Sequence, residues 1–287
     1  MPESRVGALA GGTPVRDALD GARTAIAAAG CETPHLDAEV LLAHALGVSR
    51  ERLLIDRDLT VAGPAVRTFQ DYVRRRSVRR EPVAYILGAR HFRHIELAVD
   101  PRALIPRPET ELLVEVALSL PKGSRVLDVG TGSGAVALAL KDERPDLQMS
   151  AGDLSDSALE LARENGTRLG LQVRWHQSDL LDGVGDEFDA ILSNPPYVQD
   201  TDRATLAPEI LRHEPPSALF AGADGLDIIR RLTGQVAARA SVRLLALEIG
   251  AGQAAAVGEL MRGASFPTVR AERDLAGIER VLVGERP

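Results

Sequence analysis

The stretch Asn194-Pro195-Pro196-Tyr197 has the clearest chemical character in this chain. It follows an apolar run, residues 188–192, that is typical of a buried strand, so it should lie at the carboxyl end of that strand. The two prolines fix two φ angles and remove two backbone donors. Such a turn can hold a planar NH2 group between the Asn194 side-chain oxygen and the Pro195 carbonyl, with Tyr197 packed on the plane. A plain proline turn with an asparagine cap is the structural alternative.

A glycine-rich loop, residues 128–134, lies between a strand expected at 126–129 and a helix expected at 135–140. Glycines at such a place permit a tight turn and let a ligand approach the backbone closely. The loop does not end in the Gly-Lys-Ser/Thr of a nucleoside triphosphate loop, but its spacing also satisfies a relaxed dinucleotide fingerprint, so a nicotinamide cofactor stays open at this point. The candidate cofactor-binding residues of the loop are Gly130, Thr131, Gly132, Ser133 and Gly134.

Acidic side chains end the two strands expected after this loop. Asp153 is placed to take both ribose hydroxyls of an adenosine group, and a helix cap is its alternative role. Asp179 and Leu180 follow the third strand, where a polar group can meet the edge of an adenine and an apolar side chain its face. Because the carboxyl ends of parallel strands meet at one edge of a sheet, these residues and Asn194 should come together. An adenosine cofactor beside a held NH2 group indicates methyl transfer from S-adenosylmethionine to nitrogen.

The elements that must position these residues form two patterns. Strands alternate with helices from residue 125 onward, which favours an α/β fold with a parallel, doubly wound sheet. Residues 14–82 show helical spacing with short connections, which is typical of a small helical bundle. We therefore expect a helical domain at 1–82 that begins with a loose leader over residues 1–12. A β-hairpin connector at 83–108, including strand at Tyr85–Leu87, and a catalytic domain at 109–287 should follow.

Two arginine features have open roles. Arg107 lies between Pro106 and Pro108 on a rigid, extended segment, where it either lines a site or pairs with a carboxylate. The cluster Arg74–Arg80 ends a helix expected to begin at Pro64. It is either a solvated helix face favoured by the helix dipole or a docking surface for a polyanionic partner.

The composition bounds the partners. The 287-residue chain has a net charge of −7 and only 3% aromatic residues, which argues against broad binding of nucleic acid. Its single cysteine, Cys31, cannot form an intramolecular disulfide, and no Cys/His spacing indicates a metal site. There is no signal pattern and no apolar run long enough to span a membrane, so we expect a cytoplasmic protein without a membrane partner.

With these motifs the chain resembles the release-factor glutamine methyltransferases, which are protein-(glutamine-N5) methyltransferases. Asn-Pro-Pro-Tyr is shared with DNA adenine methyltransferases, whereas the segment Leu104 to Thr110 is much more specific. The resemblance covers nearly the whole length. Its matching stretches are residues 81–82, 85–88, 104–111, 128–134, 177–179, 194–197, 214–215, 218–219, 225–226 and 248–250.

The resemblance implies a Rossmann-like, seven-stranded class I methyltransferase sheet and S-adenosyl-L-methionine as cofactor. It implies as substrate the Gln of the Gly-Gly-Gln motif in class I peptide-chain release factors, held in part by the N-terminal helical domain. Asn194, Pro195 and Tyr197 are the expected catalytic residues. Pro196 and Arg107 join them in binding substrate, Asn194 also lies beside the cofactor, and no metal is required.

One residue departs from the family pattern. The family often has an aromatic residue where this chain has Leu180, so we expect aliphatic packing on the adenine. Three alternative functions stay open: a ribosomal-protein glutamine methyltransferase, a nucleic-acid adenine-N6 methyltransferase, and a cofactor-binding protein without activity. The sequence does not reveal the oligomeric state.

Overall fold

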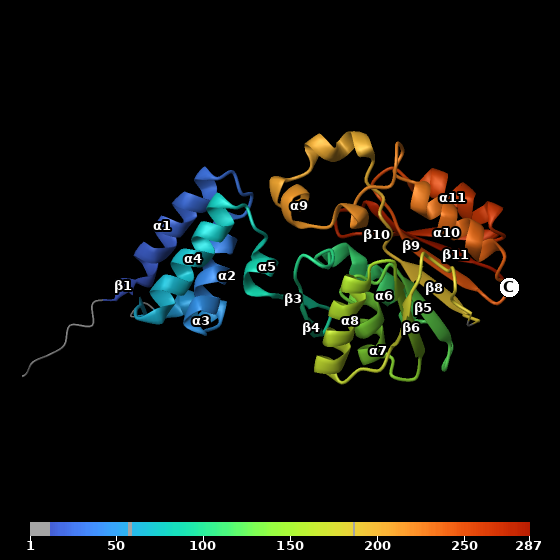
Figure 1. The fold of residues 1–287 in the computed structure, drawn as a ribbon, viewed down its shortest axis with the longest axis horizontal. Helices are drawn as coiled ribbons and strands as arrows, with labels where there is room; N and C mark the ends of the chain where they lie inside the picture. Colours follow the sequence, from blue (N-terminus) through green and yellow to red (C-terminus); the bar gives the residue numbers. More distant parts are fainter. Residues whose placement is uncertain (1–11, 57–58, 186) are drawn as a thin grey trace, which may run out of the picture. The chain divides into compact units, whose positions relative to one another are not determined.

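A computed structural model describes residues 12–56, 59–185 and 187–287 of the chain. The leader expected over residues 1–12 lies outside this part, apart from Gly12. The chain divides into two compact units, residues 1–87 and 88–287. Figure 1 shows the helical content of the first unit and the central sheet of the second.

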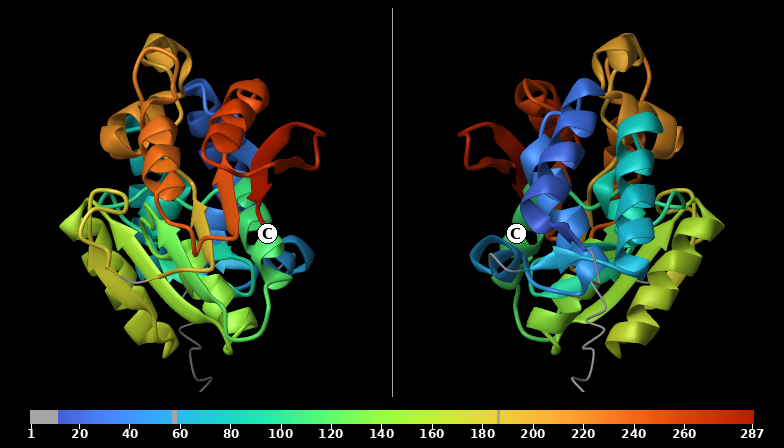
Figure 2. Two further views of the ribbon diagram at one scale, coloured as in Figure 1. Left: turned by 90° about the vertical axis from the view of Figure 1, so that its right-hand side faces the viewer. Right: turned by 90° about the vertical axis from the view of Figure 1, so that its left-hand side faces the viewer.

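The first unit is the expected small helical bundle. Helices α1, α2 and α4 pack on one another, and Figure 2 shows α1 and α4 side by side. Their apolar faces enclose a core that includes Ile26, Leu41 and Phe69. The elements are β1 (Thr13–Pro14), α1 (Val15–Ala28), α2 (Pro34–Leu46), α3 (Arg50–Ile55), β2 (Thr60–Val61), α4 (Pro64–Val78) and α5 (Val83–Leu87).

The cluster Arg74–Arg80 is largely tied down within this unit. Arg76 Nε donates to Asp37 Oδ2 over 2.6 Å, and both side chains are buried, so this pair joins α4 to α2. Arg75 makes a two-pronged contact with Glu81, with its Nε 2.8 Å from Oε2 and its Nη2 2.5 Å from Oε1. Arg75 and Arg76 therefore act inside the fold, whereas Arg74 and Arg79 are exposed.

The strand expected at Tyr85–Leu87 is wrong, because Val83–Leu87 form helix α5. Pro82 suits the first turn of a helix, and the Ile86 amide donates to its carbonyl over 3.0 Å. The hairpin lies just beyond, in the second unit, where β3 (Ala89–Phe92) pairs antiparallel with β4 (Ile95–Ala98).

The second unit contains a seven-stranded sheet of order β10-β11-β9-β8-β5-β6-β7, which confirms the doubly wound fold. The five strands β7, β6, β5, β8 and β9 are parallel, as expected, but β11 runs antiparallel to β9 and β10 antiparallel to β11. The turn at 274–278 joins β10 to β11 directly, and so short a connection permits only antiparallel pairing. The strands are β5 (Arg125–Val129), β6 (Gln148–Asp153), β7 (Arg174–Gln177), β8 (Ala190–Ser193), β9 (Leu244–Glu248), β10 (Thr268–Arg273) and β11 (Glu279–Glu285).

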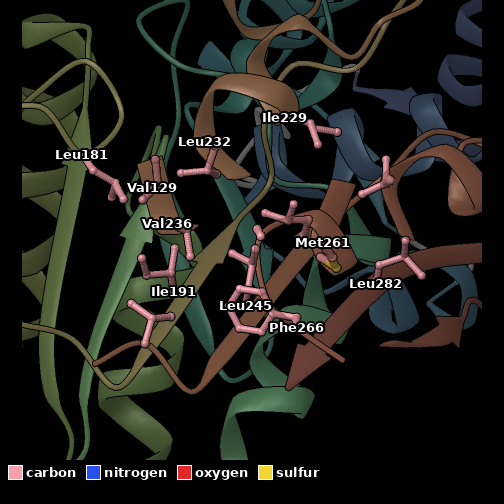
Figure 3. Close-up of a cluster of buried hydrophobic side chains, with 14 of the residues drawn as sticks. Val129, Leu181, Ile191, Ile229, Leu232, Val236, Leu245, Met261, Phe266 and Leu282 are labelled. Atoms are coloured by element: carbon pink, nitrogen blue, oxygen red, sulfur yellow. The ribbon is translucent and has the colours of Figure 1, made fainter. Parts of the chain in front are cut away.

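Helices cover both faces of this sheet (Figure 1), with α6, α7 and α8 on one side and α10 and α11 on the other. The central strands are buried on both faces, so β8 and β9 are apolar up to their last residues, Ser193 and Glu248, and β5 carries one buried acid, Asp128. Figure 3 shows Ile191 and Leu245 of the sheet packed with Val236 and Met261 of the helices. The remaining elements are η1 (Pro108–Thr110), α6 (Glu111–Leu118), α7 (Ala135–Glu143), α8 (Asp156–Leu169), η2 (Asp200–Thr205), α9 (Pro208–His213), η3 (Pro216–Ala218), α10 (Asp227–Ala237) and α11 (Ala254–Gly263).

Among the described residues, no helix combines the length and the apolar character that crossing a membrane requires.

Candidate active site

A cavity of about 420 Å³ opens at the carboxyl edge of the parallel strands of the second unit. Its volume lies within the range of small-molecule sites, and ligands of open α/β sheets bind at this edge. Nine of the residues expected from the sequence line it: Gly130, Thr131, Gly132, Ser133, Asp153, Asp179, Leu180, Asn194 and Pro196. Gly134, Pro195, Tyr197 and Arg107 are outside this lining.

The glycine-rich loop is held to the neighbouring strand. The amides of Gly130 and Thr131 both donate to the Gly152 carbonyl, over 2.8 and 3.0 Å. The Thr131 hydroxyl donates to Asp128 Oδ2 over 2.6 Å, and burial raises the pKa of that carboxyl to about 7. The loop is therefore preorganised by its own backbone and one buried acid.

Gly134 serves packing. Its φ is +85°, and an added Cβ would lie 2.9 Å from Leu138 Cδ1 and 3.3 Å from Ala162 Cβ. A side chain at this position would crowd Leu138 of α7 and Ala162 of α8, and the positive φ would strain it as well.

Asp153 ends β6 with its carboxylate fixed by the backbone. Oδ2 accepts from the Gly132 amide and Oδ1 from the Ser155 amide, each over 2.9 Å. Each oxygen keeps a further lone pair, so the carboxylate can still accept two hydroxyl hydrogens. Burial raises its pKa, and the backbone hydrogen bonds oppose that rise. The cap of α8 is Ser155, whose hydroxyl accepts from the Ala158 amide.

An ion pair lies at the part of the cavity lined by Asp179 and Leu180. Asp179 Oδ2 lies 2.7 Å from Arg231 Nη2, and both residues line the cavity. Leu180 has a φ of +56°, and the Ser178 hydroxyl donates to its carbonyl over 3.0 Å. Leu180 lines the cavity and also packs against the hydrophobic core of this unit.

Asn194 follows β8 and is tied into a chain of hydrogen bonds. Its Nδ2 donates to Thr110 Oγ1 over 3.0 Å, and that hydroxyl donates to Glu248 Oε2 over 2.6 Å. The Tyr197 hydroxyl donates to the other oxygen of Glu248 over 3.1 Å. Burial raises the pKa of Glu248 to about 6, and burial followed by the Glu248 charge raises that of Tyr197.

The proline segment places Arg107 against an acid. Arg107 Nη2 donates to Glu214 Oε1 over 2.7 Å, and the Ile105 amide donates to Oε2 over 3.3 Å. Glu214 is buried, so this pair holds the segment on the loop before η3. Of the two roles open for Arg107, the structure shows the carboxylate pairing.

Sequence reasoning missed Thr110, Glu248 and Arg231 as site residues. Glu248 is an acid at the end of a buried strand, as Asp153 is, so the same signal was present in the sequence. Thr110 belongs to the rigid segment that drew attention to Arg107. Arg231 lies on a helix among other charged residues and carries no such signal.

Two family models match this chain. The methyltransferase small domain matches residues 108–223, and the PrmC N-terminal domain matches residues 17–88. Among solved structures, the hMettl16 catalytic domain in complex with MAT2A 3'UTR hairpin 1 is similar, with a TM-score of 0.54 and 17% identity over 77% of this chain and 80% of that chain. At this identity the likeness concerns the fold alone.

Curated relatives match over nearly the full length. The release factor glutamine methyltransferase of Deinococcus radiodurans is 40% identical over 276 residues, which are 95% of this chain and 98% of that protein. The release factor glutamine methyltransferase of Xylella fastidiosa (strain 9a5c) is 44% identical over 258 residues, which are 88% of this chain and 93% of that protein. The chain belongs to the release factor glutamine methyltransferase family.

Proposed function

We propose that this protein transfers a methyl group from S-adenosylmethionine to the side-chain amide nitrogen of the Gln in the Gly-Gly-Gln motif of class I release factors. The observation that carries the proposal is the presence of Asn194 and Asp153 on the wall of one cavity. A carboxylate suited to adenosine hydroxyls and an amide side chain suited to an NH2 group thus line the same space. Family membership supports the choice of substrate, and such a substrate would be met in the cytoplasm.

Asp153 is the proposed ribose ligand. Two backbone amides fix its carboxylate, and its remaining lone pairs suit the two hydroxyls of a ribose. The glycine loop lets the cofactor lie close to the backbone, and Leu180 covers the adenine with an aliphatic surface. The bound cofactor supplies the sulfonium methyl group, and no metal is needed to make that methyl electrophilic.

The turn at Asn194 is proposed to bind the substrate amide through acceptors alone. Pro195 and Pro196 have no N–H, and Asn194 Nδ2 already donates one hydrogen to Thr110 Oγ1. A carboxamide NH2 group fits such a turn, with one hydrogen on Asn194 Oδ1 and the other on the Pro195 carbonyl.

A carboxamide nitrogen is a poor nucleophile because its lone pair is delocalised into the carbonyl. Two fixed acceptors orient the NH2 group and stabilise positive charge as it develops on nitrogen. The nitrogen forms the bond to the methyl carbon, the electrons of the carbon–sulfur bond leave with the thioether product, and the methylated nitrogen releases one proton to water. Asn194 and Pro195 are therefore the proposed catalytic residues. Tyr197 is proposed to pack on the glutamine side chain, and the Arg107–Glu214 pair to support the substrate side of the site.

The experiment that tests this proposal offers several acceptors to the purified protein with methyl-labelled cofactor. A class I release factor, a mixture of ribosomal proteins and duplex DNA are compared under the same conditions. We expect label on the release factor alone. Label on ribosomal protein or DNA would favour one of the two alternative methyltransferases, and label on no acceptor would favour a cofactor-binding protein.

A further inference from the structure

Glu248 is a buried acid that no step of the proposed chemistry uses directly. It is 1% exposed and ends β9, beside β8, from which Asn194 follows. Its two oxygens accept hydrogen bonds from Thr110 and Tyr197. A buried carboxylate with two hydroxyl donors, next to the residue proposed to hold the substrate, calls for a functional explanation.

The hydroxyl of Thr110 has one hydrogen, and a carboxylate can only accept. That hydrogen therefore lies on the 2.6 Å bond to Glu248 Oε2. Toward Asn194 the Thr110 oxygen can then only accept, and it does so from Nδ2 over 3.0 Å. The Asn194 amide is consequently fixed with its nitrogen toward Thr110, which turns Oδ1 away from Thr110 as the acceptor offered to a ligand.

We infer that Thr110 and Glu248 are positioning residues that set the polarity of the Asn194 amide, so that its oxygen faces the substrate. The inference rests on the proposed function, in which the substrate presents an NH2 group. An asparagine amide turned by half a rotation would present its own NH2 instead. Two NH2 groups facing each other cannot form the hydrogen bond that orients the acceptor nitrogen.

The rigid segment before Thr110 is proposed to hold the Thr110 hydroxyl in place. Thr110 is buried and ends η1, which begins at Pro108, two residues after Pro106. Arg107 fastens the same segment to Glu214. The rigid segment that contains Arg107 thus positions the Thr110 hydroxyl between Glu248 and Asn194.

The test replaces the Thr110 hydroxyl by a methyl group of nearly equal size. In methylation of a purified class I release factor, Thr110→Val should lower kcat on the order of 10- to 100-fold, as expected when a reacting group is misaligned. The dissociation constant of the cofactor, measured by calorimetry, should change little. Thr110→Ser keeps the hydroxyl and loses the methyl group, and it should recover most of the lost rate. If Thr110 served only to fill space with its methyl group, this variant would not recover the rate.

A matched control is Thr233→Val in α10. The Thr233 hydroxyl is also buried and donates to the Ile229 carbonyl over 2.8 Å, but it does not line the cavity. The kcat of Thr233→Val should equal that of the wild type. Should Thr110→Val fail to fold, Thr110→Ala removes the same hydroxyl without adding bulk and is measured in its place.

The outcomes separate this inference from the function on which it rests. A wild-type enzyme that leaves the release-factor glutamine unmethylated refutes the proposed function. If the wild type is active and Thr110→Val or Thr110→Ala is equally fast, the positioning role is refuted and the proposed function stands. Failure of Thr110→Ser to recover activity refutes it as well.

Discussion

Asp153 and Asn194 stand on either side of β5 and line the same cavity. Asp153 ends β6 and Asn194 follows β8, and both strands pair in parallel with β5. The residue proposed to bind the cofactor and the residue proposed to bind the substrate amide are therefore separated by one strand and the glycine loop that follows it. Their functions should be separable by mutation.

Asn194→Ala should nearly abolish methyl transfer while the cofactor still binds. The change removes the side-chain acceptor that orients the glutamine NH2 group, and loss of one preorganised partner of this kind costs roughly 100- to 1,000-fold in kcat. Single-turnover rates with a release factor measure the loss, and calorimetry with the cofactor measures binding. A variant that transfers methyl groups at the wild-type rate would rule out the amide-binding role.

Asp153→Ala should act mainly on cofactor affinity. The fixed carboxylate offers two acceptors to the ribose, and hydrogen bonds to a charged group contribute about 1.5–3 kcal/mol each. We expect the cofactor dissociation constant to rise at least tenfold, since about 1.4 kcal/mol corresponds to a factor of ten. The control is Asp156→Ala, an exposed acid on α8 outside the cavity. Equal dissociation constants for the wild type and Asp153→Ala would reject the ribose role.

The stability of the protein should depend on pH through Glu248. Burial raises its pKa from 4.5 to about 6, against hydrogen bonds from Thr110 and Tyr197, with Glu109 raising it and Arg280 lowering it. A carboxyl with a raised pKa stabilises the fold fully below pH 4.5, and this contribution is lost as the pH rises through about 6.

Glu248→Gln removes this titration. The free energy of unfolding of the wild type, measured relative to that variant, should therefore fall by about 2 kcal/mol from roughly pH 4 to pH 7. Urea unfolding of both proteins across this range provides the measurement. A difference between the two proteins that stays constant with pH would show that Glu248 titrates normally.

Arg76→Ala should destabilise the first unit strongly. The Arg76 and Asp37 side chains are 7% and 8% exposed, so the variant leaves a buried carboxylate without its countercharge and with, among the described side chains, only the Thr33 hydroxyl bonded to it. Removing one partner of a buried pair costs about 3–5 kcal/mol. Arg74→Ala breaks the exposed pair with Asp71 and should cost no more than about 1 kcal/mol. Similar urea midpoints for the two variants would contradict the structural role of Arg76.

Much of the sheet could be predicted because its strands are short apolar runs separated by helices and glycine turns. The glycine loop, Asp153 and the Asn194 turn could be placed at one edge, since parallel strands bring their carboxyl ends together. The segment Tyr85–Leu87 could not be assigned, because three apolar residues fit a helix and a strand equally well. The hydrogen bond from the Ile86 amide to the Pro82 carbonyl closes a helical turn here, and the apolar pattern does not reveal it.

The polar network behind Asn194 could not be predicted in the same way. The hydrogen bond from Thr110 to Glu248 joins residues 138 positions apart, and no local pattern records such a pairing. The flanking prolines made Arg107 a candidate for substrate binding, but in the structure its guanidinium forms an ion pair with Glu214. The sequence thus indicates where the ligands meet, while the direction of each hydrogen bond requires the three-dimensional arrangement.

Mass spectrometry of a class I release factor tests the central claim most directly. The factor is purified after co-expression with the wild-type protein, with Asn194→Ala, or alone in a host that lacks an equivalent methyltransferase. We predict a mass increase of one methyl group on the Gln of the Gly-Gly-Gln peptide with the wild type only. An unmodified glutamine in the presence of a folded, cofactor-binding wild-type protein would contradict the account.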